Sequence, residues 1–309
     1  DVAKGLGLRT LEGLLLTNFS TDPSKLSYYA AVDTSRGGAH DVVIGLHYST
    51  SDSQAALLDG ESAPFFGGRV HKGMLLDAKA VLKLIKPLLI RHLELDSHVT
   101  LAGFSVGGAS AVLVHMLLFG EVAHDPNLLL AASRITTFSF GAPPVFASQN
   151  AEATGANTLP RSFEQRVFNI IHGLDATPRL NVRNAIQTLL LCKEVDRLPM
   201  NDKERLASLA GTHAVCHTTA DKARAQALSR GATNYFPVGA PLLISQVGRD
   251  EYTCEVGTIE DVSELRLRPT MFADASAKVY TRIANGLVPK PVGLCVQLQQ
   301  ICPILKEIV

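Results

Sequence analysis

The sequence predicts an α/β fold in which a mostly parallel sheet is covered by helices. Three observations lead to this prediction. Short apolar, β-rich runs alternate with helical stretches, which is typical of parallel sheets. The 309 residues, 46 % apolar and 19 % charged, are enough for one large core. A serine between closely spaced glycines follows one expected strand and precedes an expected helix.

The expected strands are apolar runs rich in β-branched and aromatic residues. They cover residues 28–32, 41–46, 99–102, 135–140 and 167–172, and a later strand runs through Ile244. The clearest helix spans residues 75–93, and we expect Pro87 to kink it. Further helices are expected at 109–118, 202–209, 221–228 and 275–284.

The chain is expected to form one domain over residues 1–309. Between residues 182 and 232, charges, small residues and helical periodicity replace the strand pattern, so this part is interpreted as a helical insertion. Residues 288–309 contain two prolines near their start, followed by many apolar residues. They are interpreted as an appended C-terminal segment that packs on the domain.

Charge and hydropathy exclude several classes of partner. The 29 basic residues balance the 29 acidic ones, so no basic surplus is available to hold nucleic acid. No run of 18 apolar residues predicts a transmembrane segment, and the first residues show no signal peptide. Because the chain starts without methionine, the possibility that a signal peptide was removed stays open. A cytoplasmic location is slightly favoured over secretion, and the compartment is otherwise unknown.

No cofactor is expected. The five cysteines are widely spaced and form no C-x-x-C pair, so free buried thiols are the simpler interpretation. No carboxylate cluster or His/Cys spacing predicts a metal site.

The segment Gly103-Phe104-Ser105-Val106-Gly107-Gly108 has the form of a nucleophile elbow, a sharp strand-to-helix turn that presents a serine. Larger side chains at 103 and 107 would collide with the neighbouring strand and helix. The N–H group of Val106, at the start of the helix, would point at a developing oxyanion. The pattern alone is common, but strand before and helix after make Ser105 a candidate nucleophile.

Several ordered segments resemble motifs of the class 3 lipases, which include fungal triacylglycerol lipases and diacylglycerol-lipase-like enzymes. They are residues 70–74 (VHKGM for VHxGF), 103–109 (GFSVGGA for GHSLGGA), 137–145 (TFSFGAPPV for TFGxPRVG) and 166–180 (RVFNIIHGLDATPRL for RVxxxxDxVPRLP). The resemblance runs from about residue 28 to about residue 283. It implies an α/β-hydrolase fold, hydrolysis of acylglycerols or related lipid esters, and a lipid or small ester as the substrate.

The family uses Ser, Asp and His in that chain order, so the resemblance implies Ser105 as nucleophile and Asp175 as the acid that orients a histidine. Asp175 follows an expected strand, where the active sites of open α/β sheets gather. The other interpretation of Asp175 is a turn or cap residue before Pro178.

The expected histidine is missing. The family carries it in a DHxxxxY segment, and residues 274–280 here read DASAKVY, with Ala275 at the histidine position. An alanine cannot accept the proton of the serine. After Asp175 only His213 and His217 remain as candidates, and both are more readily interpreted as surface residues. His71 and His172 are expected to make local hydrogen bonds instead.

The oxyanion loop also departs from the family. Its RGT pattern is replaced by His47-Tyr48-Ser49, where Ser49 keeps the place of the stabilising N–H and hydroxyl. Tyr48 lacks the backbone freedom of glycine. His47 is interpreted as a packing substitute for arginine, with a role as base as the weaker alternative. Phe104 replaces a histidine beside the serine and is expected to fill space under the elbow.

Residues 51–68 lie where the family carries its lid. This stretch includes Phe65 and Phe66 between glycine-rich flanks, so it is expected either to cover an acyl groove and contact a lipid surface or to be a buried loop on the long helix.

Two functions and one further explanation follow. The chain is a working ester hydrolase, or it is a catalytically impaired relative that binds lipid or a protein partner. Ala275, His47 and Tyr48 favour the second. The third possibility is that Ala275 was introduced into an active enzyme.

Overall fold

The structure is a computed structural model, and it describes part of the chain. The described residues are 14–18, 26–33, 41–48, 61–95, 97–122, 133–148, 159–210, 216–229, 233–249, 251–263, 265, 267–268 and 270–286. The expected C-terminal segment 288–309 lies outside them, as do Ser49, His213 and residues 51–60.

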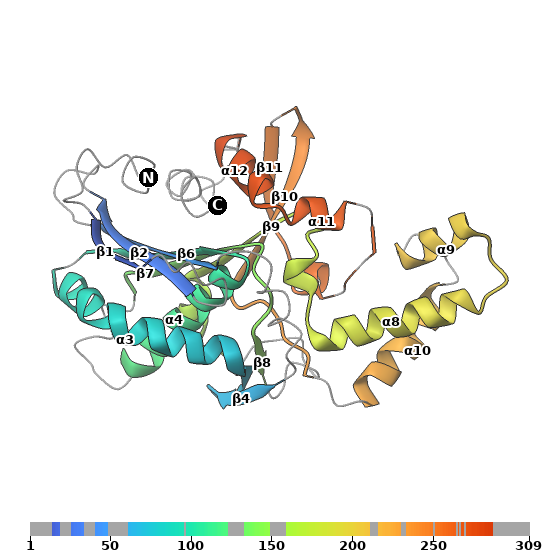
Figure 1. Ribbon diagram of the computed structural model, residues 1–309, viewed down its shortest axis with the longest axis horizontal. Helices are drawn as coiled ribbons and strands as arrows, with labels where there is room; N and C mark the ends of the chain where they lie inside the picture. Colours follow the sequence, from blue (N-terminus) through green and yellow to red (C-terminus); the bar gives the residue numbers. More distant parts are fainter. Residues whose placement is uncertain are drawn as a thin grey trace.

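An eight-stranded sheet forms the centre of the molecule (Figure 1). Its strands, in spatial order, are β1 (Leu14–Asn18), β2 (Leu26–Asp33), β3 (Asp41–Tyr48), β6 (Val99–Phe104), β7 (Ile135–Phe140), β9 (Val167–His172), β10 (Ala240–Gly248) and β11 (Glu251–Val256). The five strands from β3 to β10 run parallel to one another, whereas β1, β2 and β11 pair antiparallel at the two edges. The predicted mostly parallel sheet is confirmed.

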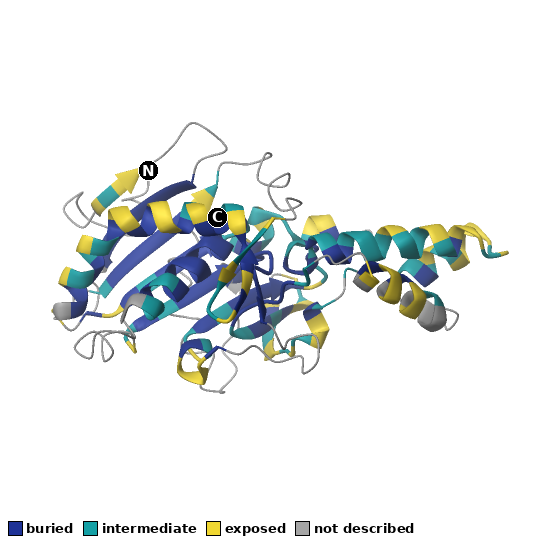
Figure 2. Ribbon diagram, turned by 90° about the horizontal axis from the view of Figure 1, so that it is seen from below, coloured by how far each residue is buried: buried dark blue, intermediate teal, exposed yellow. Residues whose placement is uncertain are grey.

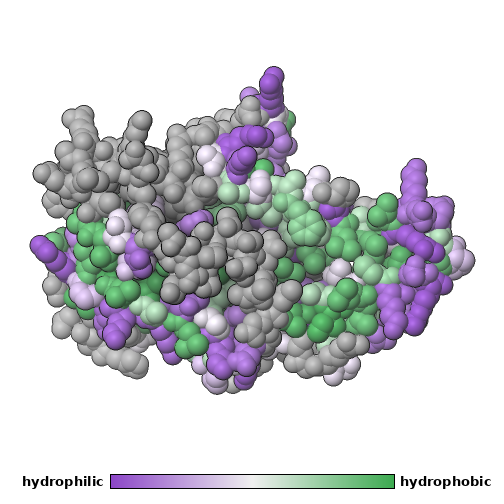
Figure 3. Space-filling model, in the orientation of Figure 1, coloured by the Kyte–Doolittle hydropathy of each residue, from purple (hydrophilic) through white to green (hydrophobic). Residues whose placement is uncertain are grey.

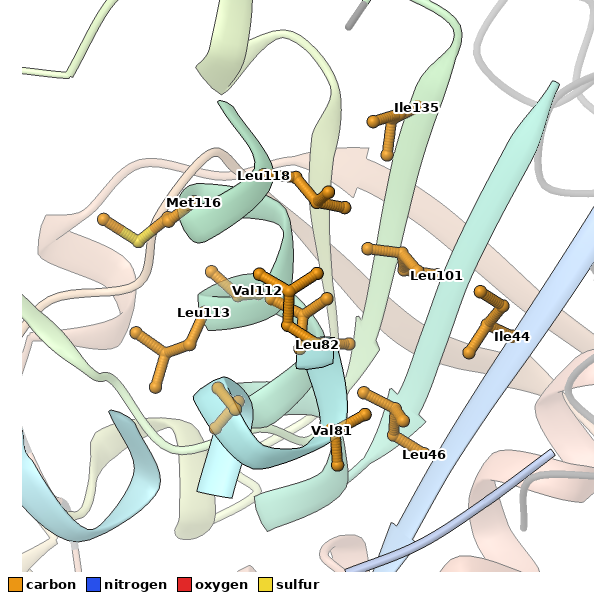
Figure 4. Packing of buried hydrophobic residues seen from close by; sticks show 14 of the residues in the cluster. Ile44, Leu46, Val81, Leu82, Leu101, Val112, Leu113, Met116, Leu118 and Ile135 are labelled. Atoms are coloured by element: carbon orange, nitrogen blue, oxygen red, sulfur yellow. The ribbon is translucent and has the colours of Figure 1, made fainter. Parts of the chain in front are cut away.

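Helices cover both faces of this sheet, so its central strands are buried (Figure 2). On one face, α3 (Lys72–Glu94) and α4 (Val106–Val122) pack together and enclose the larger apolar cluster. Figure 4 shows Val81 and Leu82 of α3 and Val112 of α4 meeting Leu46 and Leu101 of the strands. The smaller cluster, on the opposite face, includes Tyr280 and Ile283 of α12 (Ala277–Gly286).

A small sheet and several short helices complete the domain. β4 (Ser62–Phe65), β5 (Gly68–His71) and β8 (Phe146–Ser148) pair antiparallel. The short helices are α7 (Arg161–Glu164), η2 (Thr177–Arg179), η3 (Glu260–Val262) and α11 (Met271–Asp274). None of the described helices is long and apolar enough to cross a membrane.

Three helices form an arm that projects from the side of the sheet (Figure 1). They are α8 (Val182–Asp196), α9 (Asp202–Leu209) and α10 (Cys216–Ser229), and α8 packs against α10. Asn181 and Asn201 cap α8 and α9 by accepting backbone N–H bonds. Figure 3 shows apolar residues over the inner part of the arm and hydrophilic residues at its outer end. That this arm is an insertion within one domain stays a prediction.

The observed elements differ from the expected ones mainly at the edges. β7 and β9 have the expected limits, and α3 continues through Pro87 over 23 residues. The helix expected at 275–284 is instead two helices, α11 and α12, with Ala275 and Ser276 between them. The bend places Ala275 at the end of α11, where it ends a short turn rather than starting a helix.

Candidate active site

Ser105 occupies the turn between β6 and α4, in the left-handed backbone region with φ of 53°. Few residues other than glycine adopt this conformation, and those that do cluster at functional sites. The backbone is held there by three hydrogen bonds: Ser105 N donates to Phe140 O at 2.8 Å, and Ser105 O accepts from Gly108 N at 3.0 Å and from Ala109 N at 3.2 Å. The strand, strained serine and helix together form the geometry of a nucleophile elbow.

The glycines of the elbow are needed because backbone atoms pass very close to them. A Cβ atom on Gly103 would lie 2.4 Å from the backbone of Gly107. A Cβ atom on Gly107 would lie 2.3 Å from the carbonyl oxygen of Leu46, at the end of β3. These contacts explain the glycine spacing, and they show that the end of β3 touches the first turn of α4.

The expected oxyanion donors are only partly described. Val106 is buried as the first residue of α4, and the first N–H groups of a helix have no acceptor within the helix. Its N–H group is therefore available to an oxyanion at Ser105. Ser49, the second expected donor, lies outside the described residues.

Asp175 lies just after β9 and is fully buried. Its Oδ1 accepts from the Thr177 N–H at 2.8 Å, and its Oδ2 accepts from the Tyr280 hydroxyl at 2.6 Å. A Cβ atom on Gly141 would lie 2.5 Å from Asp175 Oδ2, and the preceding residue, Phe140, accepts the Ser105 N–H. Ser105 and Asp175 therefore flank the same turn at the end of β7.

Burial dominates the electrostatics of Asp175. It raises the pKa of the carboxyl group to about 6, although the donors Tyr280 and Thr177 and the charge of Arg179 act in the opposite direction. The Tyr280 hydroxyl is itself buried, and its pKa is raised well above the usual value. At neutral pH the arrangement is a tyrosine hydroxyl donating to a buried carboxylate.

The segment that should carry the histidine docks beside Asp175. Ala176 N donates to Met271 O at 3.2 Å, Leu174 N donates to Asp274 Oδ2 at 3.0 Å, and Tyr280 bonds Asp175. These contacts hold residues 271–280 against residues 174–176 on both sides of Ala275. The assignment of Ala275 to the place of the family's histidine stays a prediction.

Two described histidines on segments that match the family motifs have contacts away from Ser105. His71 caps α3, with Nδ1 accepting the Met74 N–H at 3.4 Å. His172 lies on β9 with Nδ1 3.7 Å from Asp274 Oδ1, and burial lowers the pKa of His172. Within the described part of the chain, no hydrogen bond joins an imidazole to Ser105 Oγ. The side chain of His217 and all of His213 lie outside that part.

His47 lies close to the elbow, on the strand that neighbours β6 on the side away from Asp175. Its Cα would be 3.1 Å from a Cβ atom on Gly107, so it is close to the elbow. However, β3 lies on one side of β6, whereas β7 and β9 lie on the other. His47 and Asp175 therefore lie on strands on opposite sides of the Ser105 strand, and a role of His47 as base stays the weaker alternative.

Of the three phenylalanines expected near the substrate, only Phe104 adjoins the site. Its ring packs edge-on against Tyr280, with centroids 5.5 Å apart. Phe65 and Phe66 pack on each other in the β4–β5 turn, and Phe66 lies against Gly120 of α4. Gly120 follows Ser105 by fifteen positions, which places it about 22 Å along the helix axis. The structure does not bring Phe65 and Phe66 to the elbow.

Two residues of the site had not been assigned a role from the sequence. Tyr280 was seen only as part of a motif, because its partner Asp175 is 105 residues away. Arg179 is buried and donates to the carbonyl oxygens of Asp175, at 2.7 Å, and Asp261, at 3.2 Å. The Arg179 carbonyl in turn accepts from Asn184 Nδ2 at 2.7 Å. This network ties the loop of Asp175 to the base of α8.

The chain is similar to a known family and to solved structures. The family model described as Lipase (class 3) matches residues 34–185, which confirms the resemblance seen in the sequence motifs. A comparison with curated proteins found no match.

The fold of the chain is similar to the α/β-hydrolase fold of solved lipase structures. A deletion mutant of the Rhizomucor miehei lipase propeptide complex matches with a TM-score of 0.50 and 17 % identity, over 85 % of this chain and 65 % of that one. MDLA from Penicillium cyclopium, in a mutant form, matches with a TM-score of 0.48 and 15 % identity, over 84 % and 77 % of the two chains. A lipase from Rhizopus microsporus var. chinensis matches with a TM-score of 0.42 and 19 % identity, over 54 % and 55 %. The chain thus spans only about half the length of this last lipase.

Proposed function

Because residues 34–185 match the class 3 lipases, we propose that the chain is a carboxylic ester hydrolase of that type, with Ser105 as nucleophile. The observation that carries the proposal is the elbow, in which Ser105 is held at φ of 53° beside the turn that contacts Asp175. A non-glycine residue keeps this strained conformation only when contacts with the surrounding structure hold it there, and such residues cluster at functional sites.

The proposed reaction is acyl transfer to water. Ser105 Oγ forms a bond to the acyl carbon while its proton passes to a base, and the Val106 N–H stabilises the oxyanion. The alcohol leaves with a proton. Water then hydrolyses the acyl-enzyme and releases the carboxylic acid. Asp175 is the acid that would orient the base.

Acylglycerols or related lipid esters are the proposed substrates. Large apolar side chains are exposed near the site and on the arm: Phe272 of α11 is 71 % exposed, and Leu189 of α8 is 70 % exposed. Such side chains suit contact with a lipid surface. Hydrolysis of an emulsified acylglycerol should therefore fall in Phe272→Ala more than hydrolysis of a soluble short-chain ester. Equal loss on both substrates would remove this support.

The direct test uses a fluorophosphonate probe and a short-chain p-nitrophenyl ester. Labelling and turnover should both disappear in Ser105→Ala and persist in Ser245→Ala, which changes an exposed serine on β10. Turnover that survives Ser105→Ala would show that another residue is the nucleophile.

A second candidate is a catalytically impaired lipase fold that binds lipid or a protein partner. The docking of residues 271–280 with Ala275 at the histidine position favours it. In that case the natural sequence shows little or no ester turnover. The turnover rate of Ala275→His should be about 10²- to 10⁴-fold higher, which is the usual contribution of a general base. Ala273→His, an exposed neighbour on α11, is the matched control and should gain nothing. Strong turnover without the histidine would contradict impairment.

A further inference from the structure

The side chain of Tyr48, a residue of the expected oxyanion loop, contacts helix α3 under the sheet. Tyr48 is the last residue of β3 and packs against the larger apolar cluster under the sheet. Its hydroxyl donates a hydrogen bond to Asp77 Oδ2 on α3. Tyr48 also has an ordinary backbone conformation, since it is absent from the described residues with positive φ. The loss of glycine here therefore introduces no backbone strain.

The hydroxyl of Tyr48 lies between the two helices that cover this face. Burial raises the pKa of Tyr48 far above its usual value, the Asp77 carboxylate raises it further, and the hydroxyl of Ser110 on α4 acts in the opposite direction. Ser110 is fully buried one turn after the elbow, and the Tyr48 hydroxyl donates to Asp77 rather than to Ser110. Asp77 is thus the partner that holds the phenol.

The end of β3 also touches the elbow directly. Leu46 O and His47 Cα lie against Gly107, where no Cβ atom would fit. Leu46 faces Val81 of α3 in the same cluster (Figure 4). A shift of the end of β3 would therefore be passed to the backbone of Gly107 and Val106, because close-packed backbone atoms leave no slack between them.

We propose that Tyr48 and Asp77 are a positioning pair that fixes the end of β3 against α3 and thereby holds the first turn of the elbow helix in place. Neither residue touches the substrate; both act through Leu46 and Gly107. The effect on reactivity rests on the proposed hydrolase function, whereas the effect on the position of the elbow does not.

Four variants test the pair. Tyr48→Phe removes the hydroxyl and keeps the ring, and Asp77→Ala removes the acceptor. Asp77→Asn keeps an acceptor oxygen for the Tyr48 hydroxyl and should therefore restore the behaviour of the natural sequence that Asp77→Ala loses. Tyr28→Phe is the matched control, because Tyr28 is a buried tyrosine of the same cluster and pairs with Leu46 from β2.

Hydrogen exchange measured by mass spectrometry reports the position of the elbow in the full chain. Tyr48→Phe and Asp77→Ala should accelerate exchange in peptides covering residues 44–48 and 103–108, whereas Asp77→Asn and Tyr28→Phe should match the natural sequence. Unchanged exchange in Tyr48→Phe, or equal acceleration in Tyr28→Phe, overturns the proposal.

The rate of Ser105 labelling by a fluorophosphonate, measured in the natural and Ala275→His backgrounds, gives the second readout. Tyr48→Phe should slow the maximal labelling rate by about ten- to hundred-fold with little change in half-saturating probe concentration, since misplacement affects the reacting geometry. If Tyr48→Phe is labelled at the natural rate although its hydrogen exchange is altered, the pair is only a structural contact. That result overturns the proposed effect of the pair on Ser105 reactivity. If neither background is labelled, the hydrolase proposal fails, and hydrogen exchange still decides whether the pair positions the elbow.

Discussion

The Tyr280 hydroxyl donates to Asp175 Oδ2 at 2.6 Å, so the buried carboxylate beside the elbow is bonded to a tyrosine from α12. The same hydroxyl accepts from the His172 N–H at 3.1 Å. Tyr280 therefore connects the end of β9 to the segment that carries Ala275. It keeps Asp175 in a fixed orientation whether or not a histidine is present.

Asp175 should make the stability of the protein depend on pH. Its pKa is raised from 3.8 to about 6 on folding, so the folded state binds the proton more tightly. This contribution is fully present below pH 3.8 and is lost as the pH rises through about 6, a total of about 3 kcal/mol. Urea unfolding between pH 4 and 8 measures it.

Asp175→Asn should remove most of that slope. The amide still accepts the Thr177 N–H and carries no charge, so we expect a gain of about 1–3 kcal/mol in unfolding free energy at pH 8. Asp202→Asn, at an exposed position, should keep the natural slope. A less stable Asp175→Asn protein at pH 8 would show that the ionised carboxylate is well compensated.

Tyr280→Phe should destabilise the protein, because a fully buried donor and acceptor are lost. We expect about 1–3 kcal/mol, with the larger loss at pH 8, where Asp175 is ionised, and the smaller at pH 5. Chemical denaturation at the two pH values gives the difference. Tyr252→Phe removes another buried hydroxyl of the same apolar cluster and should show no such pH dependence.

Ser105→Gly and Ser105→Ala should differ in stability although both remove the nucleophile. At φ of 53° a glycine relieves the strain that alanine retains, so the glycine variant should be more stable by about 1 kcal/mol. Thermal unfolding of the two proteins compares them. Equal stability would indicate that the elbow backbone relaxes when the serine hydroxyl is lost.

Gly107→Ala and Gly73→Ala test the closeness of β3 and the elbow. The first places a Cβ atom 2.3 Å from Leu46 O, and we expect a loss of about 1–3 kcal/mol or more. The second, in the first turn of α3, meets no atom closer than 3.5 Å and should gain about 0.5–1 kcal/mol through helix propensity. Unfolding free energies from urea titration check both signs.

The central part of the fold could be predicted from local sequence patterns. The limits of β7 and β9 were correct because each is a run rich in β-branched and aromatic residues between an arginine and a glycine. The edge strands β1 and β11 and the three strands of the small sheet were missed, since short or half-exposed strands lack that pattern. The elbow was recognisable because its strand, glycines and helix are adjacent in the chain.

Contacts between distant segments could not be predicted in the same way. Tyr48 looked like a lost glycine because its partner Asp77 is 29 residues away. Phe65 and Phe66 follow β3 in sequence, but the pairing of β5 with β8 carries their hairpin to the far end of α4. The roles of Ser105, Asp175 and Ala275 stay predictions, although the structure places all three at the same end of the sheet.

Arg179 has a consequence for engineering the arm. Through its carbonyl it accepts from Asn184 of α8, and through its guanidinium it supports the carbonyl oxygen of Asp175. Asn184 also donates to Ser263 O at 2.9 Å, after η3. The arm is therefore coupled to the loop of the buried carboxylate: grafting α8 alone onto another scaffold would leave the Asn184 side-chain amide without its two acceptors, and deleting α8 would leave the Arg179 carbonyl without the Asn184 donor.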